Sequence, residues 1–182
     1  MSKFNFIKTE LNGMFIIEPT VWEDSRGYFL ETYHYKEFEN AGIDVNFVQD
    51  NQSKSKKGVL RGLHFQTKKP QGKLVRVING SVFDVGVDLR KNSPTFGKWA
   101  GAILNNENNR QLFIPAGFAH GFLVLSDEAE FVYKCTDFYD PENEGGIIYN
   151  DPDININWPI TSDMNIILSK KDSVLPSLKE IF

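Results

Sequence analysis

Cysteine is nearly absent from this chain: Cys135 is the only one among 182 residues, and histidine occurs three times. A single cysteine cannot form an intrachain disulfide, and the cytosol is the expected compartment. No apolar run approaches the ~20 residues that a membrane-spanning helix needs. The first stretch, MSKFNFIKTEL, is too short and too polar for a signal peptide. These absences predict a soluble intracellular protein without a membrane partner.

Neither sign of charge dominates the composition. The chain has 20 Lys and Arg against 24 Asp and Glu, and the two signs are interspersed. No broad basic face for nucleic acid is expected, so an anionic ligand must be held by a few placed cations. Hydrophobic residues make up 41% of the sequence, with no internal repeat and no linker. Residues 1–182 are therefore expected to form one domain with a sizeable core.

Short alternating runs separated by turn residues dominate the sequence. Residues 4–9 and 14–18 are expected to be strands around a turn. In residues 74–89, the pair Asn79-Gly80 joins two alternating runs and predicts a tight hairpin.

Polar segments and one helix separate the other runs. Residues 53–58 (SKSKKG) are expected to be a solvated basic loop, and residues 126–129 a second hairpin loop. The first clear helical pattern covers residues 35–41 and stops at Gly42. About ten short strands with little helix predict an all-β fold, a double-sheet jelly roll or small barrel with a few short helices. Such a barrel can hold one small ligand in its mouth.

Arg61, His64 and Lys73 lie close together in residues 59–75, VLRGLHFQTKKPQGKLV. A strand histidine is more often a core residue than a catalyst, but two flanking cations without partners are costly to bury. Arg61 and His64 are three residues apart and would face opposite sides of a regular strand. We predict a bulge at Gly62, which would let both side chains reach one pocket.

Two later runs carry further candidates. His120 begins the run HGFLVL and Tyr133 lies in the run EFVYKC. If the faces that carry them line the barrel, both side chains project into its cavity. Asp84 and Asp88 face away from the apolar residues of their strand, and they are expected to be solvent-side or network carboxylates without a catalytic role. His34, beside aromatic residues, is expected to be structural.

An imidazole, an ammonium and a phenol in one pocket suit proton transfer next to a ketone. His64 has the pKa range of a base near neutrality, and Lys73 could stabilise the enolate oxygen that forms. Tyr133 could return a proton from the opposite face. A base on one wall and an acid on the other is the arrangement that an epimerase requires.

The pattern Pro-x-Gly-x-x-His at residues 115–120 resembles the second half of the cupin signature. Metal-binding cupins supply a His-x-His pair and a glutamate in the first half, whereas LHFQTKK offers one histidine. A protein metal site usually needs three ligands. No metal or other cofactor is therefore expected, and a metal-dependent cupin stays as an alternative that lacks a ligand.

Collinear motifs along nearly the whole chain resemble the dTDP-4-dehydrorhamnose 3,5-epimerase family of the cupin superfamily. They are DSRGYFLE, QDNQS, LRGLHFQ, QGKLVRV, GSVFDVGVDLR, IPAGFAHGF, YKCTDFYDP and SKKDSVLP. The resemblance implies that His64 is a base held by Asp172, that Tyr133 is the acid, and that Lys73 lies near the substrate's keto oxygen. It implies further substrate contacts at Arg61 and His120.

The same resemblance implies a nucleotide site and a homodimer. The matching nucleotide-binding positions are Arg26, Phe29, Glu31, Gln49, Asp50, Asn51, Glu144 and Lys171. In this family Arg26, Phe29 and Glu31 can reach into the neighbouring subunit's site. The implied reaction inverts C3 and C5 of dTDP-4-dehydro-6-deoxy-D-glucose to give dTDP-4-dehydro-L-rhamnose, in dTDP-L-rhamnose biosynthesis. Alternatives are an epimerase of C3 alone, a ketoisomerase of a related nucleotide sugar, or a non-catalytic sugar-binding jelly roll.

Overall fold

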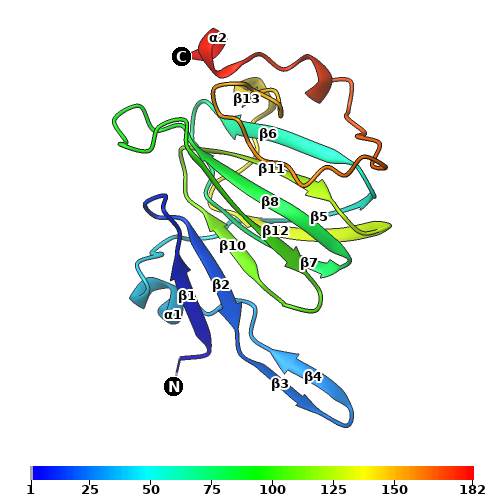
Figure 1. Cartoon of the computed structure of the whole chain (residues 1–182). Coiled ribbons are helices and arrows are strands. Elements are labelled where there is room, and N and C mark those ends of the chain that lie inside the picture. Colours follow the sequence, from blue (N-terminus) through cyan, green and yellow to red (C-terminus); the bar gives the residue numbers. More distant parts are fainter. Residues whose placement is uncertain (1) are drawn as a thin grey trace.

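Two facing antiparallel sheets make up the body of the protein, seen in a computed structural model that describes residues 2–182 (Figure 1). The six-stranded sheet has the order β1 (Phe4–Lys8), β2 (Phe15–Pro19), β10 (Gln111–Ile114), β7 (Lys73–Asn79), β12 (Glu128–Cys135) and β5 (Gln49–Lys56). The five-stranded sheet has the order β13 (Glu144–Gly146), β6 (Leu60–Gln66), β11 (Phe118–Val124), β8 (Ser81–Asp88) and β9 (Trp99–Asn105).

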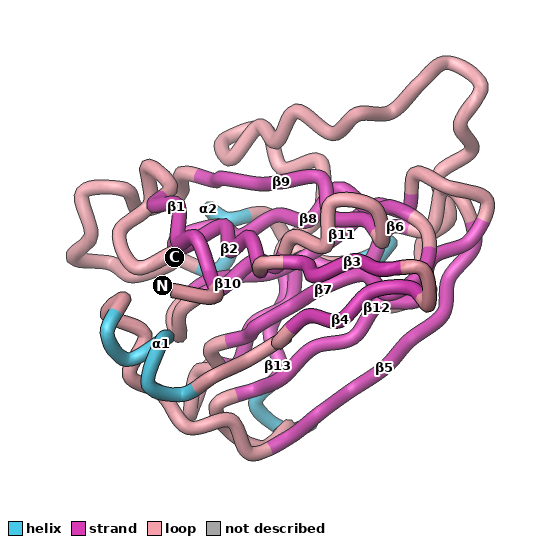
Figure 2. The backbone as a smooth tube through the Cα atoms, turned by 90° about the horizontal axis from the view of Figure 1, so that it is seen from below, coloured by secondary structure: helices cyan, strands magenta, loops and turns pink. Residues whose placement is uncertain are grey.

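The remaining elements are short. A two-stranded ribbon, β3 (Val21–Asp24) with β4 (Gly27–Leu30), projects from the body at the bottom of Figure 1. Within residues 2–182 the α-helices are α1 (Tyr35–Asn40) and α2 (Leu178–Ile181), and 3-10 turns cover Pro141–Asn143 and Asp172–Val174. Figure 2 shows how little of the chain is helical, with β5 along one edge of its sheet. The expected all-β jelly roll with a few short helices is confirmed.

The main core lies between the two sheets. It combines Val75 and Val77 from the six-stranded sheet with Phe122 and Val124 from the five-stranded one. Phe122 stacks on Phe131 of the facing sheet with ring centroids 4.3 Å apart. A second cluster packs residues 147–181 onto the outer face of the five-stranded sheet. Because both faces of that sheet are covered, its central strands β8 and β11 are buried almost throughout.

The expected hairpin at Asn79-Gly80 is wrong, although the turn exists. β7 and β8 follow one another directly, but β7 pairs with β10 and β12 while β8 pairs with β11 and β9. The turn therefore carries the chain from one sheet to the other. The hairpin loop expected at residues 126–129 is wrong for the same reason: residues 125–127 connect β11 and β12, which lie in different sheets. A tight turn specifies a reversal of direction, and burial of both apolar faces selects the pairing partners.

The basic segment 53–58 is also different from the expected loop. Residues 53–56 continue β5, where Lys54 lies opposite Glu130 and its ammonium contacts the Glu128 carboxylate at 2.7 Å. Opposite charges on neighbouring strands favour this pairing, and lysines are common on exposed sheet edges. By contrast, β1 and β2 pair as expected, and α1 falls within the predicted helix.

Asp88 belongs to a buried network, so the solvent-side alternative is wrong for it. Its carboxylate accepts hydrogen bonds from the side chains of Arg90, Ser93 and Thr95 at 2.5–2.8 Å. Burial alone would raise the pKa of Asp88, but these hydrogen bonds outweigh it and hold the pKa well below its usual range. The network fixes the loop between β8 and β9.

The predicted irregularity at Gly62 is present. Opposite β11, His64 pairs with His120 and Arg61 with Phe122, so three steps along β6 match two along β11. The one extra residue in β6 is a bulge, and Gly62 within it has φ +106°. His120 and Phe122 share a face of β11, so Arg61 and His64 are brought to a common face as well.

We predict that Gly62→Ala destabilises the fold more than Gly42→Ala does. Both glycines have positive φ, but a Cβ at Gly62 would lie 2.5 Å from the His120 carbonyl oxygen, whereas one at Gly42 would meet nothing within 4 Å. Gly42→Ala should cost about 1 kcal/mol, and Gly62→Ala about 2 kcal/mol more. Urea unfolding of both variants measures the difference, and equal losses would show that the close approach to β11 is unimportant.

Candidate active site

A cavity of about 300 Å³ opens between the two sheets near one end of the barrel. Its walls include six residues singled out from the sequence: Gln49, Asn51, His64, Lys73, Tyr133 and Glu144. β6 of the five-stranded sheet supplies His64, and β12 of the six-stranded sheet supplies Tyr133. The imidazole and the phenol thus come from opposite layers of the sandwich.

His64 contacts a carboxylate from far along the chain. Its Nε2 lies 2.6 Å from Oδ1 of Asp172, whose side chain is buried. Burial lowers the pKa of His64 below its ordinary value, and the Asp172 hydrogen bond and charge oppose that effect in part. The positive charge of Lys73 adds to the lowering. The site therefore favours a neutral imidazole at neutral pH, which can accept a proton.

A second His–Asp pair lies deeper in the barrel. His120 Nε2 is 3.0 and 3.1 Å from the two carboxylate oxygens of Asp84, which is fully buried. The His120 ring stacks on Phe131 of the facing sheet, as expected if it projects inward. Burial raises the pKa of Asp84, and His120 and Lys73 oppose the rise. Asp84 is therefore an interior residue, and the solvent-side alternative is wrong for it too.

Lys73 and Tyr133 face the same cavity, and burial shifts the pKa of each side chain. Burial lowers the pKa of Lys73, and the electrostatic influence of Cys135, Asp84 and Glu144 opposes this lowering. In residues 2–182 no carboxylate lies within ion-pair distance of the Lys73 ammonium. Burial raises the pKa of Tyr133, so its hydroxyl keeps its proton at neutral pH.

Glu144 and Tyr139 line the cavity, and Arg61 lies near Tyr133 without being one of the lining residues. Arg61 donates hydrogen bonds to the Ser55 hydroxyl at 3.1–3.2 Å, and its positive charge partly opposes the rise in the pKa of Tyr133. Glu144 accepts a 2.6 Å hydrogen bond from the Tyr139 hydroxyl and forms an ion pair with Lys171.

Four of the residues singled out from the sequence lie elsewhere in this chain. Arg26 and Phe29 are on the projecting ribbon, where the Arg26 guanidinium binds the Asp24 carboxylate and its side chain is 87% exposed. Glu31 forms an ion pair with Lys3. Asp50 is on the outer face of the six-stranded sheet and binds Lys134 at 2.9 Å. One chain does not bring these four to the cavity.

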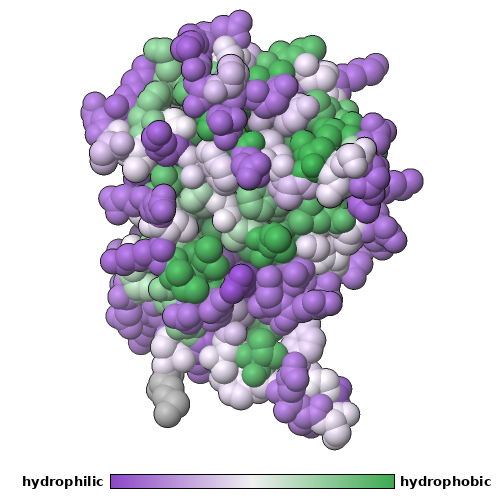
Figure 3. Space-filling model, in the orientation of Figure 1, coloured by the Kyte–Doolittle hydropathy of each residue, from purple (hydrophilic) through white to green (hydrophobic). Residues whose placement is uncertain are grey.

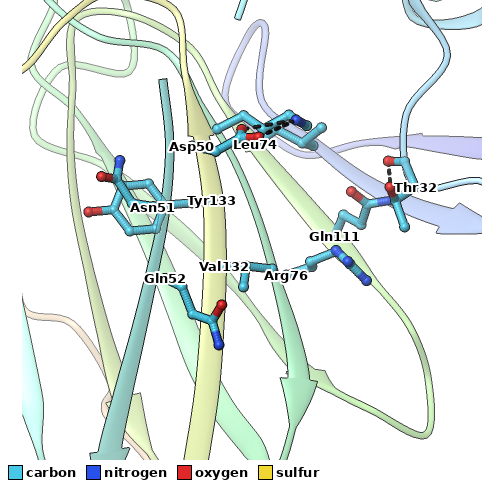
Figure 4. Close-up of a pocket in the computed structure, with 10 residues that line it drawn as sticks. Thr32, Asp50, Asn51, Gln52, Leu74, Arg76, Gln111, Val132 and Tyr133 are labelled. Atoms are coloured by element: carbon cyan, nitrogen blue, oxygen red, sulfur yellow. Dashed lines mark hydrogen bonds and ion pairs between the residues drawn. The ribbon is translucent and has the colours of Figure 1, made fainter. Parts of the chain in front are cut away.

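A second hollow of about 400 Å³ occupies that outer face (Figure 4). Arg76 and Gln111, which lie opposite each other on β7 and β10, form one side of it, and Asp50 and Lys134 another. Gln111 is buried and donates to the Thr32 carbonyl at 2.9 Å. The hollow and the cavity lie on opposite faces of one sheet.

Comparison with known proteins identifies the family. The family model described as dTDP-4-dehydrorhamnose 3,5-epimerase matches residues 8–180. The chain belongs to the dTDP-4-dehydrorhamnose 3,5-epimerase family. It is 58% identical over 180 residues to the enzyme of that name from Methanothermobacter thermautotrophicus, covering 99% of this chain and 97% of the relative.

Solved structures of the epimerase family share the fold. The dTDP-6-deoxy-D-glucose-3,5-epimerase of Legionella pneumophila, in complex with dTDP-4-keto-L-rhamnose, has a TM-score of 0.94 and 52% identity, covering 98% of this chain and 95% of that one. A 3'-monoepimerase from Streptomyces bikiniensis, in complex with dTDP-quinovose, has a TM-score of 0.88 and 35% identity, covering 95% of this chain and 87% of that one. The family resemblance seen in the sequence motifs is confirmed.

The site of this epimerase-family chain has further residues that the sequence pattern does not single out. Asp84 lies behind His120; alternation places it on the face opposite Val85, but the pattern does not show that this face is the barrel interior. Tyr139 and Gln66 line the cavity. The Gln66 amide oxygen is buried without a hydrogen-bond partner in the described chain.

The described residues include neither a metal-binding cluster nor a helix that could span a membrane. Residues 2–182 contain no group of three or more His, Cys, Asp or Glu side chains placed to hold a metal ion. None of the helices in this range has the length and apolar character needed to span a bilayer.

We predict that Asp172→Asn lowers the pKa of His64 further. The wild-type imidazole should titrate below its ordinary value of about 6.5, and removing the carboxylate charge removes an influence that raises its pKa. Histidine side-chain NMR across a pH series measures this. Asp50→Asn, on the outer face, is the control and should leave the titration unchanged. An unchanged or higher pKa in Asp172→Asn would contradict the pairing.

Proposed function

We propose that this chain epimerises dTDP-4-dehydro-6-deoxy-D-glucose at C3 and C5 to give dTDP-4-dehydro-L-rhamnose, without a metal or other cofactor. The observation that carries the proposal is that His64, paired with Asp172, and Tyr133 enter one cavity from opposite sheets. Inverting a carbon requires proton removal on one face and proton delivery on the other. Family membership supports the choice of a dTDP-sugar as substrate.

His64 is the proposed base. Its Nε2 is the nitrogen that contacts Asp172, so an Nε2–H donates to the carboxylate and Nδ1 is left to take the proton. Asp172 then stabilises the imidazolium that forms. The lowered pKa of His64 keeps the imidazole unprotonated before the reaction.

Lys73 is proposed to stabilise the enolate. Removing a proton at C3 or C5 places negative charge on the C4 oxygen, and a fixed cation in a cavity shielded from water lowers the energy of that charge. His120, held by Asp84, offers a second polar contact from the barrel interior. Asp84 is a positioning residue here because it touches His120 rather than the substrate.

Tyr133 is the proposed acid. Its raised pKa keeps the phenol protonated, so it can donate a proton to the enolate carbon from the wall opposite His64. The proton taken by His64 and the proton lost by Tyr133 balance, and exchange with water restores both groups.

The nucleotide is proposed to run from the cavity along β5. Gln49 and Asn51 offer amide hydrogen bonds to thymine, and Arg61 suits a diphosphate oxygen. The Lys171–Glu144 ion pair borders the same opening. Asp50 faces the outer side of its sheet in this chain.

A homodimer is proposed to complete the nucleotide site. The projecting ribbon exposes Phe29 by 63% and Tyr28 by 61%, with no body of its own chain to cover them. Figure 3 shows apolar patches on the body and mostly polar or neutral residues on the ribbon tip. Docked on a second copy, the ribbon would bring Arg26, Phe29 and Glu31 to the partner's cavity.

We expect a native mass of twice the 20.8 kDa of one chain in sedimentation experiments at micromolar concentration. Phe29→Ala should weaken the dimer about tenfold or more, because large aromatic side chains dominate interface energies. Ile103→Ala, at a residue that is 47% exposed on the edge strand β9, should leave the dimer unchanged. A monomeric wild-type protein would overturn the dimer proposal.

Incubation with dTDP-4-keto-6-deoxyglucose in deuterated water tests the reaction. Deuterium at both C3 and C5, read by NMR, is the expected result. His64→Ala should slow exchange at least ~100-fold, and Tyr133→Phe should slow inversion more than exchange, since His64 can still remove the proton. Tyr35→Phe, on α1, is the control and should match wild type.

The alternatives give different labelling. Exchange at C3 alone would favour a mono-epimerase, like the 3'-monoepimerase from Streptomyces bikiniensis. If neither carbon exchanges, both the 3,5-epimerase and the mono-epimerase hypotheses are overturned, and a sugar-binding role is favoured. Equal exchange in wild type and His64→Ala would remove His64 from the role of base.

A further inference from the structure

The carboxylate that contacts His64 stands on a segment without regular strands. Asp172 opens the 3-10 turn Asp172–Val174, which follows a long stretch of loop after β13. His64, in contrast, is fixed in β6 between β11 and β13. The 2.6 Å contact between His64 Nε2 and Asp172 Oδ1 therefore depends on the interactions that fix the backbone conformation around residue 172.

Hydrogen bonds dock this segment on both sides of the turn. Before it, the Ile167 N–H donates to the Gly58 carbonyl at 2.9 Å, and its carbonyl accepts from the Leu60 N–H at 3.0 Å. After it, the Pro176 carbonyl accepts from the Ile148 N–H at 2.9 Å. These contacts set where the segment lies against the sheet. Between residues 167 and 176 the described chain has no further backbone hydrogen bond to the sheet, and the backbone bonds within this stretch are local.

Ser169 supplies the local interaction nearest to Asp172. Its hydroxyl accepts a hydrogen bond from the Asp172 N–H at 3.0 Å, and its carbonyl accepts from the Ser173 N–H at 3.1 Å. This is the pattern of a side chain capping the first turn of a helix, where the acceptor lies three residues before the donor. Within residues 2–182 no other side chain bonds the Asp172 backbone.

We propose that Ser169 is a positioning residue that holds the Asp172 carboxylate within hydrogen-bonding reach of His64. The inference rests on the proposed function, in which His64 is the base and Asp172 orients it. Without the Ser169 hydroxyl, the Asp172 N–H loses its partner and the turn loosens. A displacement of ~1 Å in a supporting group can cost up to 100-fold in rate.

Ser173 provides a matched contrast in the same turn. Its hydroxyl donates to the Lys170 carbonyl at 3.0 Å, and Ser173 is an exposed residue, as Ser169 is. It stabilises the turn without touching Asp172. If the two serines served only the stability of the turn, Ser169→Ala and Ser173→Ala would have similar effects.

The test compares kcat and KM for dTDP-4-keto-6-deoxyglucose in single variants of full-length protein. Ser169→Ala should lower kcat about tenfold, with KM within twofold, as expected for losing a capping hydrogen bond behind the base. Ser169→Thr keeps the hydroxyl and should restore most of the activity. Ser173→Ala should match wild type, and thermal unfolding of each variant confirms that it is folded.

Two readouts separate positioning from simple stability. In an Asp172→Asn background, adding Ser169→Ala should cause no further loss, because the group that it positions is already gone. In Ser169→Ala alone, the acid limb of kcat/KM should move to lower pH. His64 loses part of the Asp172 influence that raises its pKa, while Glu144 and Lys73, the other charged groups facing it, are unchanged.

The outcomes distinguish the inference from the function on which it rests. A Ser169→Ala variant with wild-type kcat and pH profile, beside an impaired Asp172→Asn variant, would overturn the role of Ser169 alone. Losses of the same size in wild-type and Asp172→Asn backgrounds would also overturn it, since they would indicate a general structural effect. Wild-type activity in Asp172→Asn would instead overturn the proposed pairing of Asp172 with the base.

Discussion

The close approach of β6 and β11 is the constraint on which the site depends. A Cβ at Gly62 would lie 2.5 Å from the His120 carbonyl oxygen, and one at Gly121 would lie 2.7 Å from the Arg61 carbonyl oxygen. Only two facing glycines allow the strands to meet with one extra residue in β6. That residue turns Arg61 and His64 to the same side, and it sets His64 beside His120. Without the bulge, one of these two side chains would point to the other face of the sheet.

The fold combines an apolar core with buried charged groups, and the buried carboxylates described above are compensated by their neighbours. Asp84 and Asp172 each contact a histidine, and Asp88 is surrounded by hydrogen-bond donors. Buried carboxylates are tolerated when partners satisfy them. Lys73 differs, because its ammonium faces the cavity and no carboxylate among residues 2–182 lies within ion-pair distance of it. An uncompensated cation of this kind is suited to a substrate that brings or develops negative charge.

Groups that act together here come from distant parts of the chain. His64 and Asp172 are 108 residues apart, and Tyr133 lies on the facing sheet. Sheet pairing fixes His64 and Tyr133 rigidly, whereas Asp172 depends on a docked loop and a capped turn. The ribbon with Arg26 and Phe29 extends away from its own cavity. Completing the nucleotide site from a second copy would make assembly a condition for tight binding.

The sequence by itself determined the strand-rich fold, the short helix before Gly42, the family and the bulge. These depend on local features: alternation with period two, a glycine after a helical run, collinear motifs, and a three-residue spacing across Gly62. Only the tertiary structure decided that β7 and β8 lie in different sheets, that Asp84 faces inward and that Lys54 extends β5. It also placed Arg26 and Asp50 away from the cavity of their own chain. Alternation separates the two faces of a strand, but which face is the core depends on the layer that covers it, and long-range pairing sets that layer.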